Sequence, residues 1–152
     1  MVLVHGLTGI ASGLKIGLGH ISGATQPDDV VQAYIGAYRS GDLVPGCPRI
    51  LAFSDQHDPD HWRVEDLRRL VDAIAGYEAG AGRLVLYHGA IVANTDVQAA
   101  IGELYCVLWE LRGGPQPSYA QTRDMERAVA DLCESPGDAR NLQEQLLSVA
   151  AR

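Results

Sequence analysis

Three polar side chains lie at the ends of short apolar runs, and their types suit acid–base chemistry. His5 precedes Gly6 in "MVLVHG", Asp55 follows "RILAFS", and His88 precedes Gly89 in "RLVLYHG". Histidine titrates near neutral pH and commonly acts as a general acid or base, and an aspartate can orient it. We therefore take His5, Asp55 and His88 as candidate catalytic residues.

These side chains can act together only if the three apolar runs are neighbouring strands of one parallel sheet. Open parallel sheets bind ligands outside the carboxyl ends of their strands. His57 would lie close behind this edge, and Gly6, Gly9 and Gly89 would let the backbone approach a ligand closely. The sequence thus predicts a pocket for a small polar molecule, with hydrolase or lyase chemistry. The alternative is that both histidines are merely hydrogen-bonded at buried strand ends.

The segment "AFSDQHDPDHW", residues 52–62, contains three acids and two histidines and raises the question of a metal site. Two histidines four residues apart can share a metal when both lie on one helix face. However, Asp58 followed by Pro59 is typical of a helix N-cap and first helical residue, and Asp60 suits the first turn. His57 would then precede the helix. The segment therefore predicts a helix start and no metal site.

Apolar strand-like runs alternate with segments of helical periodicity, which is typical of α/β proteins with a parallel sheet. Strands are predicted at 1–6, 49–55 and 83–89, and helices at 27–40, 58–80 and 97–111. The glycine-rich segment 6–23 is expected to be either a loop that opens a helix or a glycine-rich helix packed tightly against the sheet. Two further helices are predicted from Ser118 and Ser135. We expect one Rossmann-like, three-layer domain over residues 1–152, with a short parallel sheet of three to four strands and two extra C-terminal helices.

Composition restricts the partners. The 152 residues include 19 acidic and 12 basic side chains, a formal net charge of −7, which argues against a nucleic-acid surface. Residues 1–24 are nearly uncharged and contain six glycines but no basic N-terminal region, so neither a signal peptide nor a membrane span is expected. The three cysteines are widely spaced and form no CxxC pair, which favours reduced thiols in the cytoplasm.

Three short segments resemble known families. "VLVHGLTG" resembles the strand and oxyanion turn of α/β-hydrolases, although the chain has no GxSxG nucleophile elbow. "GLTGIAS" together with "VANT" resembles the flavin-binding pieces of cysteine decarboxylase-type flavoproteins, which would imply FMN. "VANTDVQAAIGELY" resembles the acidic helix of nucleoside deoxyribosyltransferases and related N-glycosidases of nucleosides or NAD. There Glu103 would attack or stabilise a ribosyl carbon, with Asp96 nearby; alternatively, Glu103 simply faces outward. The cofactor stays undetermined.

A hypothesis from another class is that the chain is a non-catalytic interaction module. The C-terminal third, residues 115–152, is predicted to form two amphipathic helices on a sheet too small to need both. Their apolar positions are Met125, Val129, Leu132, Leu142, Leu146 and Val149. Such helices can form a homodimer or dock on a protein partner.

Overall fold

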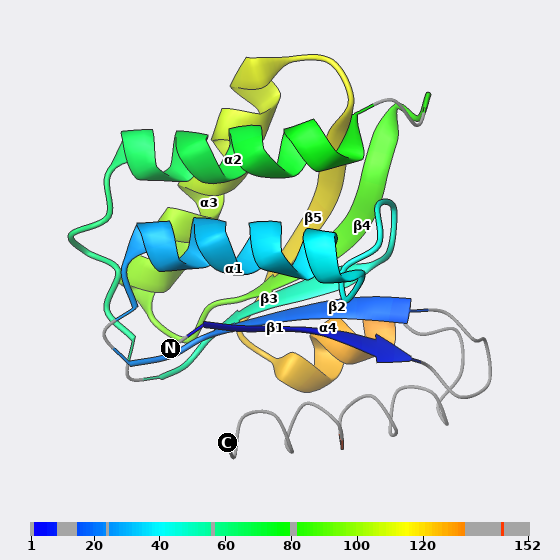
Figure 1. The fold of residues 1–152 in the computed structure, drawn as a ribbon. Coiled ribbons are helices and arrows are strands. Elements are labelled where there is room, and N and C mark those ends of the chain that lie inside the picture. The colour runs from blue at the N-terminus through cyan, green and yellow to red at the C-terminus, as the bar shows by residue number, and fades with distance from the viewer. Residues whose placement is uncertain are drawn as a thin grey trace.

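The computed structural model describes residues 2–8, 15–23, 25–55, 57–79, 82–132 and 144, and Figure 1 shows their arrangement. The strands are β1 (Val2–Thr8), β2 (Lys15–Ile21), β3 (Arg49–Phe53), β4 (Val85–Val92) and β5 (Gln116–Thr122). The helices are α1 (Pro27–Ser40), α2 (Val64–Glu78), α3 (Asp96–Arg112) and α4 (Met125–Leu132).

The described strands form one sheet in the order β1-β2-β3-β4-β5. Strands β2 to β5 are parallel, which confirms the α/β class and the short parallel sheet, whereas β1 is antiparallel to β2. Because successive right-handed crossovers advance in one direction, α1, α2 and α3 lie on one face. Helix α4 lies on the other face (Figure 1), so the described elements form three layers. The order of the parallel strands never reverses, so they form no switch-point crevice.

The expectation of a loop or helix over 6–23 was wrong for residues 6–8, which end β1, and for residues 15–21, which form β2. Its glycines alternate with the apolar residues Ile16 and Leu18, both buried. A Cβ at Gly17 would collide with Leu43, and one at Gly19 would lie 3.0 Å from the Tyr34 hydroxyl. These glycines therefore let the α1 side pack closely on the strand, and they obscured the strand pattern in the sequence.

The helix predicted from Ser118 was also wrong, because Gln116–Thr122 forms β5, at one end of the described sheet order. The Gln116 N–H donates to the Leu84 carbonyl, so it faces β4. The next residue, Pro117, therefore faces the outer side, where its missing N–H costs no ladder hydrogen bond. Helix α4 follows at Met125. The helix predicted from Ser135 lies outside the described residues.

Helix α2 begins at Val64 and not at Asp58, so the predicted start was wrong. Asp58 instead accepts the backbone N–H of Asp60 (3.1 Å) and stabilises a turn. The helix is capped by Asp66, whose carboxylate accepts the Arg63 N–H at 2.9 Å. The residues between β3 and α2 are thus free to build the loop at the carboxyl edge.

Two apolar clusters cover the two faces of the sheet. The larger lies under α1, α2 and α3, and the smaller lies against α4. In the smaller cluster the fully buried Ala128 packs on the sheet, with Met125 and Leu132 partly buried beside it. Two apolar positions assigned to a dimer interface by the interaction hypothesis therefore contact the protein's own sheet. No helix in the described residues is long and apolar enough to cross a membrane.

Candidate functional site

The structure does not bring the three predicted catalytic residues together. His5 lies inside β1, where it pairs with Leu18 of β2, and not at a carboxyl end of the parallel strands. Strand β1 is antiparallel to β2 and separated from β3 by it. The prediction that His5 shares an edge with Asp55 and His88 was therefore wrong. Of the predicted glycines beside it, Gly6 pairs with Gly17, and Gly9 lies outside the described residues.

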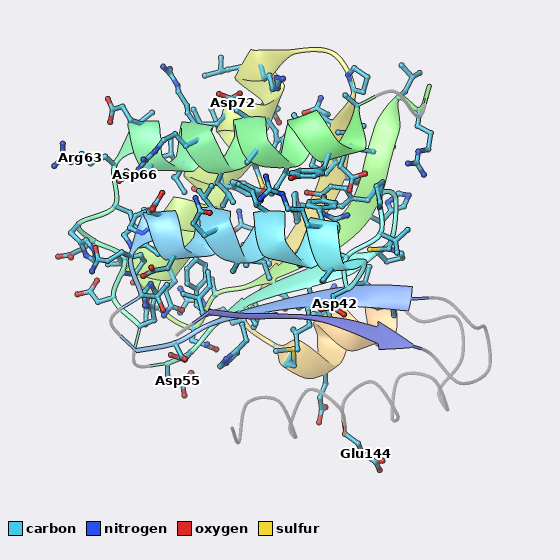
Figure 2. All side chains as sticks on the ribbon, in the orientation of Figure 1. Asp42, Asp55, Arg63, Asp66, Asp72 and Glu144 are labelled. Atoms are coloured by element: carbon cyan, nitrogen blue, oxygen red, sulfur yellow. The ribbon has the colours of Figure 1, made fainter. Side chains whose placement is uncertain are left out.

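His88 is exposed in the middle of β4. Gly89 pairs with Arg49, so His88 is level with position 48, seven positions before Asp55 (55 − 48 = 7). At ~3.3 Å per residue this is roughly 23 Å along the sheet. Asp55 points away from the protein in an exposed turn (Figure 2). A Cβ at Gly89 would collide with the Tyr119 ring, so this glycine serves packing.

His57 is the predicted residue that does lie buried at the carboxyl edge, with 3% of its surface exposed. Its Nδ1 lies 3.0 Å from the Gly23 carbonyl, and its ring stacks on Phe53. A carbonyl only accepts hydrogen bonds, so Nδ1 is the donor, and the tautomer protonated on Nδ1 carries its lone pair on Nε2. This Nε2, like the nearby Ser54 hydroxyl, is buried without a hydrogen-bond partner among the described residues.

Gln98, which is fully buried, fixes the backbone around His57. Its side-chain amide donates to the carbonyls of Ser54 (2.8 Å) and His57 (2.7 Å), and its oxygen accepts the Asn94 N–H (2.8 Å). The Asn94 side chain in turn donates to the Phe53 carbonyl at 2.7 Å. The loop after β3 is thereby tied to the start of α3. The sequence "TDVQ" carries the Thr-x-x-Gln signature of a helix start, although here the glutamine side chain bonds elsewhere.

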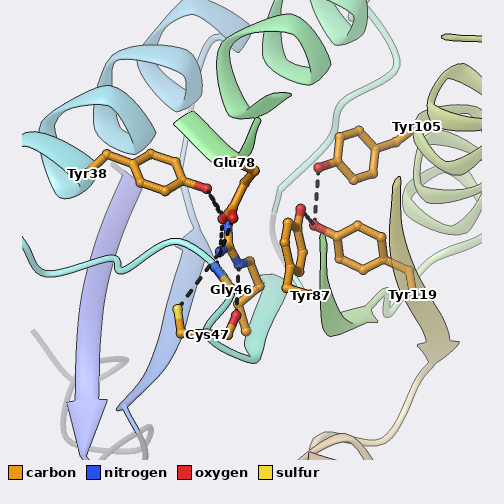
Figure 3. A network of polar contacts seen from close by, with 8 residues as sticks. Tyr38, Gly46, Cys47, Glu78, Tyr87, Tyr105 and Tyr119 are labelled. Carbon is orange, nitrogen blue, oxygen red and sulfur yellow. Dashed lines mark hydrogen bonds and ion pairs between the residues drawn. The ribbon is translucent and has the colours of Figure 1, made fainter. Parts of the chain in front are cut away.

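The opposite, amino end of the sheet contains a buried ion pair that the sequence analysis missed. Arg49 Nη2 lies 2.5 Å from Glu78 Oε1, and the two side chains are 1% and 0% exposed. The Tyr38 hydroxyl donates to the same Glu78 oxygen (2.7 Å) and accepts from Arg49 (2.6 Å), while the Gly46 N–H donates to Glu78 Oε2 (2.8 Å). Every charged group of the pair is hydrogen-bonded (Figure 3).

Aromatic rings enclose the arginine of this pair. The Arg49 guanidinium carbon lies 3.6 Å from the centre of the Tyr87 ring, a cation–π contact. The Tyr119 hydroxyl contacts those of Tyr87 (2.6 Å) and Tyr105 (3.2 Å). Burial raises the pKa of all three of these tyrosines above the usual value of 10. Cys47, whose sulfur contacts the Arg49 guanidinium, is also buried in this cluster.

One signal in the sequence pointed to this pair. Glu78 ends α2, where the partial negative charge of the helix disfavours a carboxylate, and no basic residue occupies that last turn. An acid in such a place needs a cationic partner from elsewhere in the fold. The sequence does not reveal that this partner is Arg49, 29 positions earlier.

A hollow of about 490 Å³ lies beside the ion pair, where α2 and α3 end and β4 and β5 begin. Its apolar lining includes Ala75, Ala79, Leu86 and Pro115, and its charged lining comprises Glu78, Arg83 and Arg112. The carboxyl edge differs, because the void lined by Phe53 and Trp62 there has a volume of only about 10 Å³.

The two acidic residues that the N-glycosidase resemblance suggested, Glu103 and Asp96, line neither the hollow nor the void at the carboxyl edge. Glu103 is exposed on α3, as the outward interpretation expected, and Asp96 forms an ion pair with Arg123. Within the described ranges, no group of three or more His, Cys, Asp or Glu side chains could hold a metal ion.

The fold and these two regions define an α/β protein whose sheet, in the described part of the chain, has four parallel strands and one antiparallel strand, with a hollow at its amino end. No family model, no curated protein and no solved structure matches the chain.

Proposed function

We propose that this protein binds a small ligand in the hollow at the amino ends of β4 and β5. The observation that carries the proposal is the hollow itself, whose volume of about 490 Å³ lies within the roughly 300–1,000 Å³ of small-molecule sites. Its lining also has the expected composition, an apolar surface with a few charged groups. The ligand stays a small molecule, as the sequence suggested, but the binding place moves to the other end of the sheet.

The buried ion pair supports a preformed site. Glu78 belongs both to the lining of the hollow and to the network with Arg49 and Tyr38. Through its second oxygen it also holds Gly46, in the loop between α1 and β3. The end of α2 and this loop are therefore fixed before a ligand arrives, which lowers the entropy cost of binding.

Blocking the hollow tests the proposal. Ala79 lines it and is exposed at the end of α2, so Ala79→Trp should fill the hollow without disturbing the core. Ala100→Trp, at an exposed position of α3, is the matched control. Thermal unfolding is followed with FMN, NAD, nucleotides, benzoate and benzamide. A ligand at a hundred times its Kd stabilises by about 2.7 kcal/mol, roughly 5 to 10 °C here.

The expected result is a shift with at least one compound in the wild type and Ala100→Trp that disappears in Ala79→Trp. A shift of equal size in both tryptophan variants would place the ligand elsewhere and contradict the proposal.

A second candidate is the carboxyl edge, favoured by the buried, unpaired Nε2 of His57. With its proton fixed on Nδ1 by Gly23, Nε2 would accept a hydrogen bond from a ligand N–H or O–H, or remove a proton in hydrolase or lyase chemistry. His57→Phe keeps an aromatic ring on Phe53 and removes this acceptor. Loss of a thermal shift in His57→Phe, with the shift retained in Ala79→Trp, would favour this candidate over the first.

A further inference from the structure

Resting on the proposed function, we infer that the ligand of the hollow is an organic anion. Its carboxylate or phosphate group is bound by Arg83 and Arg112, and its apolar body fills the rest of the hollow. Three charged residues line the hollow, Arg83, Arg112 and Glu78, and the sign of the site depends on whether the charge of Glu78 is available to a ligand.

The charge of Glu78 is already compensated inside the protein. One carboxylate oxygen accepts from Arg49 and Tyr38, and the other accepts from the Gly46 N–H. The side chain has no exposed surface. Glu78 and Arg49 together are neutral, so the net charge offered to a ligand comes from Arg83 and Arg112.

Neither arginine is strongly paired. No carboxylate in the described part of the chain forms an ion pair with Arg83. The Arg112 Nη1 lies 3.8 Å from Asp72 Oδ1, and both side chains are largely exposed. Exposed pairs at such distances contribute little, about 0–1 kcal/mol. Both guanidinium groups therefore keep hydrogen-bond donors for a ligand.

The fold brings the two arginines to one place from separate elements. Arg83 lies in the segment before β4, with its guanidinium against Gly46, where a Cβ would collide with it. Arg112 is the last residue of α3. The ends of α2 and α3 each add a partial charge of about −0.5, which is less than the two full positive charges of the arginines. The lining is therefore positive on balance.

The remaining lining specifies the rest of the ligand. Ala75, Ala79, Leu86 and Pro115 offer no hydrogen-bonding side chain, and the space exceeds that of an inorganic ion. The planar guanidinium group binds carboxylates and phosphates through paired hydrogen bonds. A carboxylate or phosphate ester with an apolar body matches both parts of the site.

Calorimetric titration with four probes tests the inference: benzoate, phenyl phosphate, the neutral benzamide and inorganic phosphate. Each is titrated into the wild type, Arg83→Gln and Arg112→Gln. Arg68→Gln is the matched control, because Arg68 is exposed on α2, ten positions before Glu78, and outside the hollow (78 − 68 = 10). The melting temperature of each variant checks the fold.

We expect benzoate or phenyl phosphate to bind the wild type and Arg68→Gln equally. Each hollow variant should bind at least about tenfold more weakly, which is the loss of one charge-assisted hydrogen bond. Benzamide and inorganic phosphate should also bind the wild type at least about tenfold more weakly. The stronger of benzoate and phenyl phosphate identifies the anionic group.

Three results would overturn the inference: unchanged affinity for both organic anions in both arginine variants, benzamide binding as tightly as benzoate, or no binding of any probe. Ala79→Trp separates this failure from failure of the proposed function. If benzamide binds well and Ala79→Trp abolishes its binding, the hollow is a ligand site without anion selectivity. If the anions need the arginines but bind Ala79→Trp normally, the hollow is not the site.

Discussion

The two ends of the parallel sheet are organised by different means. At the amino end a full ion pair, Arg49 with Glu78, is buried beside an open hollow, and its charged groups are all hydrogen-bonded. At the carboxyl end the neutral side chains of Gln98 and Asn94 hold the loop after β3, and space is scarce. There the unpaired groups, such as His57 Nε2, lie inside the packing.

The two ends therefore differ both in the interactions that hold them together and in the space that they leave for a ligand. Charges leave water at a high free-energy cost, so a buried pair persists only where its geometry is fully satisfied, and removing one partner leaves the other without compensation. Neutral amides cost less to bury and less to disrupt. Substitutions in the hydrogen-bonded network of Arg49, Glu78 and Tyr38 should therefore destabilise the protein most. The hollow beside this network is nevertheless the more accessible place for a ligand.

The largest effect is expected from Arg49→Met, which leaves Glu78 buried without its counter-charge. Loss of one partner of such a pair lowers the free energy of unfolding by about 3–5 kcal/mol. Urea denaturation of the purified variant measures the loss. Arg69→Met, which breaks the exposed pair with Asp66, is the control and should cost less than about 1 kcal/mol.

The double variant Arg49→Met/Glu78→Leu checks the cause of this loss. Because it removes both charges, it should be more stable than Arg49→Met alone. If Arg49→Met costs no more than Arg69→Met, the ion pair contributes nothing particular to the amino end, and the contrast between the two ends is lost.

A smaller effect is expected at the carboxyl end from Gln98→Leu. This substitution keeps an apolar volume but leaves the carbonyls of Ser54 and His57 and the N–H of Asn94 without their partner. At about 1 kcal/mol for each hydrogen bond, the free energy of unfolding should fall by about 2–3 kcal/mol. Gln32→Leu, at an exposed position of α1, is the matched control. An equal loss of stability in both variants would show that the hydrogen bonds of the Gln98 side chain do not stabilise the protein.

The sequence predicted those helices and strands whose own residues show the start, stop and hydrophobic signals of the element. Helix α1 has Pro27 in its first turn and Gly41 at its end in the left-handed conformation, and β3 is apolar from Ile50 to Phe53. Strand β2 was missed because Gly17 and Gly19 are needed by neighbours distant in the sequence. Strand β5 was missed because at the end of the sheet its residues are mostly polar or partly exposed.

The candidate site was less predictable than the fold, because it depends on pairing across elements. Nothing near Arg49 in the sequence indicates a carboxylate 29 positions later, and nothing near Arg83 indicates a hollow shared with the end of α3. The prediction for His5 failed because β1 runs antiparallel to β2, and the prediction for His88 failed because β4 continues past it to Val92. His57 was predicted near the carboxyl edge, where it does lie, because it follows a strand that the sequence predicted.

The smallest effect that separates the two ends is a pH dependence of the amino end. Burial raises the pKa of Tyr119 well above its usual value of 10. The unfolded chain therefore loses this proton at a lower pH than the folded protein does. The stabilisation is complete below pH 10 and is lost as the pH rises toward the folded pKa.

One such tyrosine contributes a slope of at most about 1.4 kcal/mol per pH unit to the free energy of unfolding. Tyr119→Phe should flatten the alkaline fall in stability by up to this amount, measured by urea denaturation from neutral pH to above 10. Gln98→Leu removes no tyrosine, so it should lower stability equally at every pH and leave the slope unchanged. An unchanged slope in Tyr119→Phe would mean that this hydroxyl ionises alike in the folded and unfolded states. Burial at the amino end would then not disfavour the charged tyrosinate.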